Sequence, residues 1–125
     1  MYAPTNDAEP EVKDDFYEEL HTVNDKVPLH DILVVMVDLN AKIRKCYHGE
    51  EGIVGKNVLR GDRSENGERF VSFCALNNLA ITSTMLLHKD IHKYTWTSPD
   101  GLHKNQIDHI AINSKFKRSV RDTRA

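Results

Sequence analysis

The sequence feature that most constrains the fold is a run of six apolar residues, Ile32 to Val37, the longest apolar run in the chain. Four of the six are β-branched, which favours a strand over a helix. An unbroken apolar run of this length predicts a strand buried on both faces, as in layered α/β folds. The run leads directly into Asp38-Leu-Asn40, and such folds place their chemistry at the ends of buried strands.

Two helices are predicted on either side of this strand. Apolar residues three or four apart predict a first helix that opens at Pro10 and is stopped by Pro28. Ser64 or Asn66 can cap a second helix, whose C-terminus falls at Asn77-Asn78. The stripe of the first helix comprises Val12, Phe16, Leu20, Val23 and Val27, and one side of the second carries Phe70, Phe73, Cys74 and Asn77.

The remaining segments predict a long loop and three further strands. Residues 42–63 are polar and hold four glycines, which predicts an irregular loop of the kind that is usually functional or disordered. Strands are predicted over 79–83, 94–97 and 106–112, with a turn at 98–101 between the last two. The order of helix, strand, loop, helix and three strands predicts one α/β unit.

Charge and composition narrow the function classes. The 17 Lys+Arg and 19 Asp+Glu give a net charge of −2, but residues 1–30 sum to 2 − 8 = −6 and residues 31–125 to 15 − 11 = +4. The last twelve residues form a basic tail with Lys115, Lys117, Arg118, Arg121 and Arg124 against Asp122 alone. This tail can neutralise phosphates through counterion release, and the alternative is a solvated terminus. There is no membrane-length apolar run, no leader-like start and no disulfide framework. We therefore expect an intracellular protein, with the nucleus among its compartments, that is neither secreted nor membrane-bound.

Asp38 and Asn40 are the first candidate catalytic residues. They lie two apart at a strand end, so they point the same way if the strand geometry continues. A carboxylate there can accept a proton from an attacking water or face a hydrated cation, and the amide can orient what is bound. The alternative is a polar cap where the strand leaves the core.

Asp108 is the third candidate, because isoleucines flank it and its neighbour His109 in the last predicted strand. A buried carboxylate is costly unless it is paired, so Asp108 should have a partner. It could orient a histidine, as the acid of a hydrolytic triad does, or be a structural residue held by backbone amides. His109 falls on the other face and is predicted to be a packed strand residue.

Aromatic and basic residues indicate a surface for substrate. Lys93, Tyr94 and Trp96 lie together before the turn, and aromatics beside cations can stack on bases and contact phosphates. The alternative packs Trp96 on the core. Tyr2 could bond a phosphate through its hydroxyl. Among the histidines, the pair His88 and His92 is four apart, but its context is not clearly helical, so a zinc site there is not favoured.

Several motifs together resemble a known superfamily. Tyr2-Ala-Pro, the strand ending in Asp38-Leu-Asn40, and Gln106-Ile-Asp108-His109 occur in the order seen in the endonuclease/exonuclease/phosphatase superfamily. Longer segments resemble the endonuclease domain of non-LTR (LINE-like) retrotransposons and the related craniofacial development protein 2-like proteins. These segments are Ser64-Glu-Asn-Gly-Glu-Arg-Phe70, Phe73-Cys74, Tyr94-Thr-Trp-Thr-Ser-Pro-Asp-Gly101 and Lys104-Asn-Gln-Ile-Asp-His109.

The resemblance implies a four-layered α/β sandwich that cleaves DNA phosphodiester bonds with Mg²⁺ (or Mn²⁺) and no small-molecule cofactor. It implies that Tyr2 contacts the scissile phosphate and that Asp38 positions or activates the attacking water, with any metal contact made through water. Asn40 would orient water and phosphate, and Asp108 would buttress the catalytic histidine. Asn6 is a secondary candidate for substrate binding, as is Trp96. The alternatives are a phosphatase or phosphodiesterase of the same superfamily and a non-catalytic nucleic-acid-binding or interaction remnant.

Three departures from the family pattern carry expectations of their own. Val37 stands where the family has a glycine, which crowds a close backbone approach. Thr5 follows the Tyr-x-Pro motif, so Asn6 is one place late. The amino-terminal half with its metal-binding glutamate and the terminal Ser-Asp-His segment are missing, so residues 1–125 are expected to be a carboxy-terminal half, truncated at both ends. Such a half should have a bare apolar sheet face and little or no nuclease activity.

Overall fold

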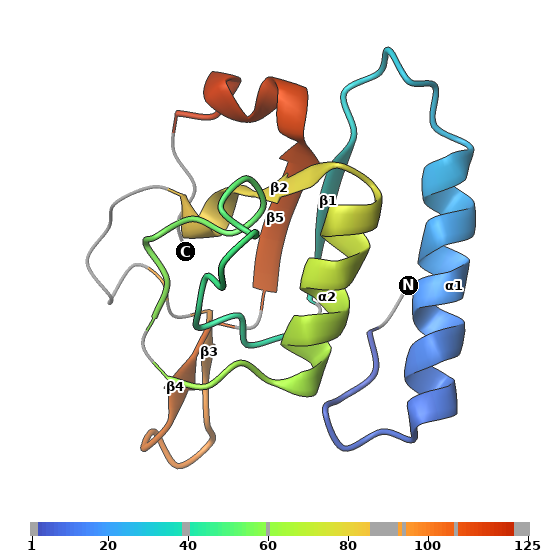
Figure 1. Ribbon diagram of the computed structural model, residues 1–125. Coiled ribbons are helices and arrows are strands. Elements are labelled where there is room, and N and C mark those ends of the chain that lie inside the picture. Colours follow the sequence, from blue (N-terminus) through green and yellow to red (C-terminus); the bar gives the residue numbers. More distant parts are fainter. Residues whose placement is uncertain are drawn as a thin grey trace.

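In the computed structural model, the two α-helices pack on one face of a three-stranded antiparallel sheet (Figure 1). The strands are β1 (Val34–Asp38), β2 (Leu79–Ile81) and β5 (Asp108–Asn113), in the order β1-β5-β2. A separate hairpin pairs β3 (Trp96–Thr97) with β4 (Lys104–Asn105). The mixture of helices with a small sheet agrees with the predicted α/β class.

The structure describes most of the chain, with gaps at both ends and in five internal places. It describes residues 3–38, 41–59, 61–85, 93, 95–106 and 108–121, and for 37, 38, 104 and 105 it describes the main chain only.

Both predicted helices are present. α1 spans Pro10–Asp25 and α2 spans Glu65–Leu76. Ser64 is the cap of α2, because its Oγ accepts a hydrogen bond from the Gly67 N–H at 3.1 Å. At the other end Asn78 has a φ of 54°, the left-handed conformation in which asparagine commonly ends a helix.

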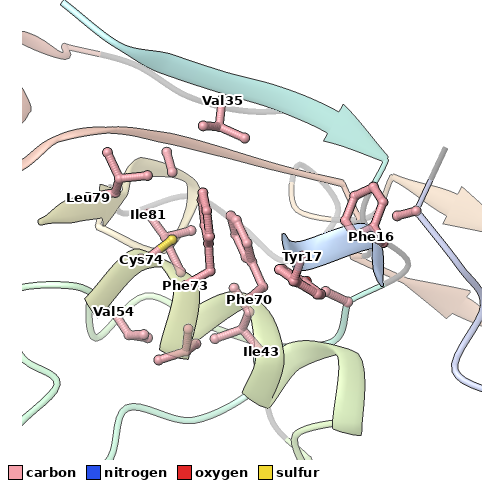
Figure 2. Close-up of a cluster of buried hydrophobic side chains, with 14 residues drawn as sticks. Phe16, Tyr17, Val35, Ile43, Val54, Phe70, Phe73, Cys74, Leu79 and Ile81 are labelled. Atoms are coloured by element: carbon pink, nitrogen blue, oxygen red, sulfur yellow. The ribbon is translucent and has the colours of Figure 1, made fainter. Parts of the chain in front are cut away.

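The hydrophobic core lies between the sheet and α2 (Figure 2). Phe70 and Phe73 of α2 face Val35 of β1, and Leu79 and Ile81 of β2 close the same cluster. α1 adds Phe16 and Tyr17, whose rings meet edge to face at 5.1 Å. The buried hydroxyl of Tyr17 has its pKa raised, first by desolvation and then by the nearby Cys74 thiol.

The predicted long loop is irregular, as expected, but it is packed into the fold. Ile43, Val54 and Leu59 are buried, and Val54 forms a parallel bridge with Ile81 of β2. Gly55 approaches the backbone of Thr84 so closely that a Cβ would lie 2.2 Å from its carbonyl oxygen. The segment therefore acts as an extra layer of the core.

The predicted apolar stripe of α1 is partly wrong. Val12 and Val23 are about half exposed, whereas Lys13 is fully buried. Lys13 can be buried because its Nζ donates to the Asn6 carbonyl at 2.6 Å and lies 3.1 Å from the carboxylate of Glu65. Glu65, at the N-terminus of α2, thus supplies the negative charge that allows Lys13 of α1 to be buried.

The strand formed by the apolar run is buried on one face and not on both. Val35 is buried, but the exposed fractions of Val34 and Met36 are 43% and 66%. The physical reason is that the described residues cover the outer face of β1 only in part. Towards the other edge, the 3₁₀ helix η3 (Ser114–Ser119) packs on β2 and β5, and Ile112 of β5 is buried.

Two smaller boundaries also differ from expectation. The strand predicted over 79–83 ends at Ile81 and continues as the 3₁₀ turn η1 (Thr82–Thr84). The turn predicted at 98–101 is confirmed, because the Gly101 N–H donates to the Ser98 carbonyl at 2.9 Å and Gly101 has a φ of 74°.

Candidate functional site

Two of the three predicted catalytic residues occupy opposing positions in the sheet. Asp38, the last residue of β1, is the register partner of Asp108, the first residue of β5. The same register makes Leu33 the partner of Asn113, whose N–H donates to the Leu33 carbonyl at 3.3 Å. Hydrogen-bonded and non-hydrogen-bonded pairs alternate in an antiparallel ladder, so Asp38 and Asp108 form a non-hydrogen-bonded pair. Residues in such pairs have Cα atoms about 4.5 Å apart, the closer of the two spacings.

The main chain of Asp108 is held from the hairpin side. Its N–H does not face β1, and it donates instead to Thr95 Oγ1 at 3.1 Å. The residue is partly exposed, so one of the two predicted acids opens towards solvent. Thr95 was not among the sequence candidates, although it lies inside the Tyr94-to-Gly101 motif.

His109 faces the opposite side of β5 and is buried, as predicted, with 2% of its surface exposed. Its Nδ1 lies 3.0 Å from Ser83 Oγ, and its Nε2 lies 2.9 Å from the Ala41 carbonyl oxygen. The ring stacks on Phe70, with centroids 6.1 Å apart and planes 26° apart. Neither Ser83 nor Ala41 was singled out from the sequence, because only the fold brings them to this ring.

The partners of His109 define its protonation. A carbonyl oxygen can only accept, so Nε2 carries the hydrogen, and Nδ1 accepts from the Ser83 hydroxyl. Burial lowers the pKa of His109 from 6.5 to about 4, against the opposing effect of the hydrogen bonds to the Ala41 and Gln106 main chain. The ring is neutral at neutral pH, and both nitrogens are engaged. It is therefore not arranged as a general base for a water molecule.

Trp96 lies on the surface of the β3–β4 hairpin, opposite Asn105. It is 40% exposed, so the alternative in which it packs on the core is wrong. The hairpin extends away from the helices (Figure 1), and its turn is braced by the Ser98 hydroxyl, which accepts from the His103 N–H at 3.0 Å. Lys93 is buried, so the phosphate contact expected of a cation beside these aromatics is not available at this lysine.

Asn6 has a role within the fold. Its Oδ1 accepts a hydrogen bond from the Asn66 N–H at 3.2 Å, in the first turn of α2. Its carbonyl accepts from Lys13. A role of Asn6 in substrate binding stays a prediction.

Other predicted positions lie outside the described residues. Tyr2 and Asn40 do so, together with Tyr94 and the pair His88 and His92.

The basic tail is described as far as Arg121 and supplies exposed cations on η3. Lys115 and Arg118 are exposed, and Lys115 Nζ donates to the Leu29 carbonyl at 2.8 Å.

The two cysteines, Cys46 and Cys74, are free thiols. Within the described part of the chain, no three His, Cys, Asp or Glu side chains gather as a metal ligand set. No helix in the same part is long and apolar enough to cross a membrane.

Fold and site together define a small α/β unit with two acids paired at the end of its sheet. The sequence is similar to craniofacial development protein 2 of Bos taurus, with 37% identity over 124 residues, and to that of Tragulus javanicus, with 36% over 124 residues. Each match covers 99% of this chain but 20% and 21% of the relative, so the chain spans about a fifth of the length of the curated relatives it matches. No protein-family model and no solved structure matches the chain. The resemblance to craniofacial development protein 2-like proteins is thereby confirmed.

Proposed function

We propose that this chain is part of a retroelement-derived endonuclease domain of the endonuclease/exonuclease/phosphatase type, which hydrolyses DNA phosphodiester bonds with Mg²⁺ or Mn²⁺. The observation that carries the proposal is the non-hydrogen-bonded pairing of Asp38 with Asp108. The fold joins two acids that are seventy residues apart in the sequence, and the motifs had assigned them to one site. Asn40 follows Asp38 by two residues and is the third catalytic residue of the proposal.

The donor chemistry of this group suits a hard cation. Carboxylate and amide oxygens, together with water and phosphate oxygens, are the ligands that Mg²⁺ prefers. When bound, the cation would neutralise charge that develops on the phosphate. Asp38 would hold it through water and accept a proton from the attacking water, while Asn40 would orient that water. Asp108 would orient the catalytic histidine expected outside this chain.

Features of the surface support DNA as the substrate. Trp96 is an exposed aromatic on a hairpin, and aromatic side chains stack on bases without regard to sequence. Lys115 and Arg118 lie exposed on η3, where they can contact phosphates. The substrate-binding residues of the proposal are Tyr2, Asn6 and Trp96.

The exposed outer face of β1 supports the proposal that the chain is one half of a four-layered sandwich. Val34 and Met36 lie on that face, and Ile32 is also exposed just before the strand. An apolar hollow of about 270 Å³ between α1 and β1 is lined by Leu20 and Val23 among others. The partner we propose for these surfaces is the amino-terminal half of the same domain. Without it, we expect weak or no nuclease activity.

Manganese binding provides a direct test of the site. We expect Mn²⁺ added to the ¹⁵N-labelled chain to broaden the amide signals of Asp38 and Asp108 before those of other residues. Asp38→Ala and Asp108→Ala should abolish the selective broadening, whereas Asp15→Ala, which removes an exposed acid on α1, should leave it unchanged. Broadening centred on the acidic helix α1 instead would contradict the proposed site.

Activity and DNA binding separate the proposal from its alternative. Nicking of supercoiled plasmid in Mg²⁺ should be weak at most, and any activity should disappear in Asp38→Ala and Asn40→Ala. Strong nicking that both substitutions abolish would contradict the expectation of a weak fragment. The alternative, a non-catalytic nucleic-acid-binding or interaction remnant, is favoured by Val37 in place of glycine. As a nucleic-acid-binding remnant it predicts salt-dependent DNA binding without selective Mn²⁺ broadening. DNA binding that is absent or independent of salt would contradict both the endonuclease and the nucleic-acid-binding remnant.

A further inference from the structure

His109 joins two segments that carry the proposed site, although it takes no part in the proposed chemistry. It is adjacent to Asp108 in β5 and is the register partner of Val37, the residue before Asp38. Its ring reaches beyond that partner to the carbonyl of Ala41, which is fully buried. The chain is therefore tied to β5 on both sides of Asp38, by the ladder before it and by the imidazole contact with Ala41 after it.

The hydrogen bond to Ala41 has a fixed direction. Ser83 Oγ–H donates to Nδ1, which leaves Nε2 as the nitrogen that carries hydrogen and donates to the carbonyl. Ser83 belongs to η1, which follows the other neighbour of β5 in the sheet. Residues near all three strands thus set the orientation of one ring, and the contact with Phe70 restricts its tilt.

We infer that His109 is a positioning residue, which holds the end of β1 against the start of β5 and so keeps Asp38 opposite Asp108. The link to catalysis rests on the proposed function, whereas the restraint itself follows from the contacts of the His109 ring. The device is needed here because β1 is an edge strand, paired with β5 alone among the described residues, and edge strands fray at their ends. A donor on the core face restrains the chain from the side of β5 opposite to Asp108.

Two substitutions separate positioning from packing. His109→Leu fills a similar volume but removes the donor to Ala41, whereas His109→Gln keeps an N–H group near the position of Nε2. Amide exchange of Val37 should rise about fivefold or more in His109→Leu, the effect of losing one hydrogen bond. His109→Gln should restore it towards the wild-type rate, and the exchange of Phe73 in α2 should stay unchanged in both variants. Should His109→Leu fail to fold, Ser83→Ala provides a milder version that frees the ring orientation.

Mn²⁺ affinity connects the geometry to the site. We expect the dissociation constant for Mn²⁺, measured from the broadening of the Asp108 amide, to rise about fivefold in folded His109→Leu and to recover in His109→Gln. A purely structural role would lower the denaturant midpoint and leave this constant unchanged, which would overturn the inference.

The inference and the proposed function can fail separately. If the wild-type chain shows no selective Mn²⁺ broadening, the proposed function fails, and the exchange of Val37 still decides whether His109 anchors β1. A long-range ¹H–¹⁵N spectrum provides an independent check, since it should show hydrogen on Nε2. Hydrogen on Nδ1, or equal Val37 exchange in His109→Leu and wild type, would overturn the inference about His109.

Discussion

Arg63 holds Glu50 with both of its terminal nitrogens, Nη1 at 2.9 Å from Oε1 and Nη2 at 2.7 Å from Oε2. The side chain of Arg63 is only 1% exposed, and its Nε donates to the Ile43 carbonyl at 3.1 Å. The guanidinium also lies 4.7 Å from the ring centroid of Tyr47. One side chain therefore holds together the start and middle of the irregular 42–63 segment.

Arg63→Ala should destabilise the chain by about 3 kcal/mol, because it leaves the Glu50 carboxylate and the carbonyl of the buried Ile43 without their donor. The free energy of unfolding in urea measures the effect. Arg69→Ala is the matched control, since Arg69 pairs with Asp14 and Glu65 near the surface and should cost below about 1 kcal/mol. Equal losses in the two variants would show that the interior position of Arg63 has no special effect.

Gly67→Ala should destabilise the chain even though alanine is the better helix former by about 1 kcal/mol. Gly67 lies in α2, and a Cβ there would stand 2.2 Å from the Lys42 carbonyl oxygen. Backbone must move to accept it, so we expect a net loss of about 2 kcal/mol. Gly52→Ala is the control, because a Cβ at Gly52 would meet nothing within 4 Å. A stabilised Gly67→Ala variant would contradict the close packing of α2 on the 42–63 segment.

Stability should rise as the pH increases from about 4 to 6.5 because of His109. The pKa of His109 is about 4 in the folded chain and 6.5 for the free side chain, so the unfolded chain binds more protons in this range. The contribution is complete above pH 6.5 and is lost as the pH falls to 4, by about 3 kcal/mol in total. Urea unfolding between these pH values tests the slope.

His109→Gln is the control for this pH dependence. This substitution should remove most of the rise in the free energy of unfolding between pH 4.5 and 6.5. Protonation of Glu50 also destabilises the chain in acid, because hydrogen bonds from Arg63 hold the pKa of Glu50 below its usual value. This second loss of stability occurs only below pH 4.5. A slope that persists above pH 4.5 in His109→Gln would show that another group titrates there.

Met36→Lys should leave the free energy of unfolding within about 0.5 kcal/mol of wild type, since Met36 is 66% exposed on the uncovered face of β1. The same substitution should reduce the binding of a hydrophobic dye, measured by its fluorescence. Val35→Lys is the contrasting variant. It should unfold the chain, because it places a charged side chain at the buried position of Val35. Strong destabilisation by Met36→Lys would show that the outer face of β1 is covered.

Local sequence signals were enough to predict both α-helices and four of the strands, but not β4 or the 3₁₀ helices η1 and η3. The cap at Ser64, the left-handed residue Asn78 and the turn that ends at Gly101 depend on neighbours within a few residues. The alternation in the last strand likewise placed His109 inside and Asp108 on the other face. These features follow from residue type and spacing, which is why a single sequence reveals them.

Tertiary structure decided what the local pattern left open. Whether the apolar run is buried on one face or two depends on what packs against β1, and the inward turn of Lys13 depends on Glu65, more than fifty residues away. The partners of His109 come from two other segments of the chain. The pairing of Asp38 with Asp108 likewise follows from the strand register, which hydrogen bonding and packing across the sheet determine. The sequence by itself therefore determined which residues could act together, and long-range contacts decided which of them meet.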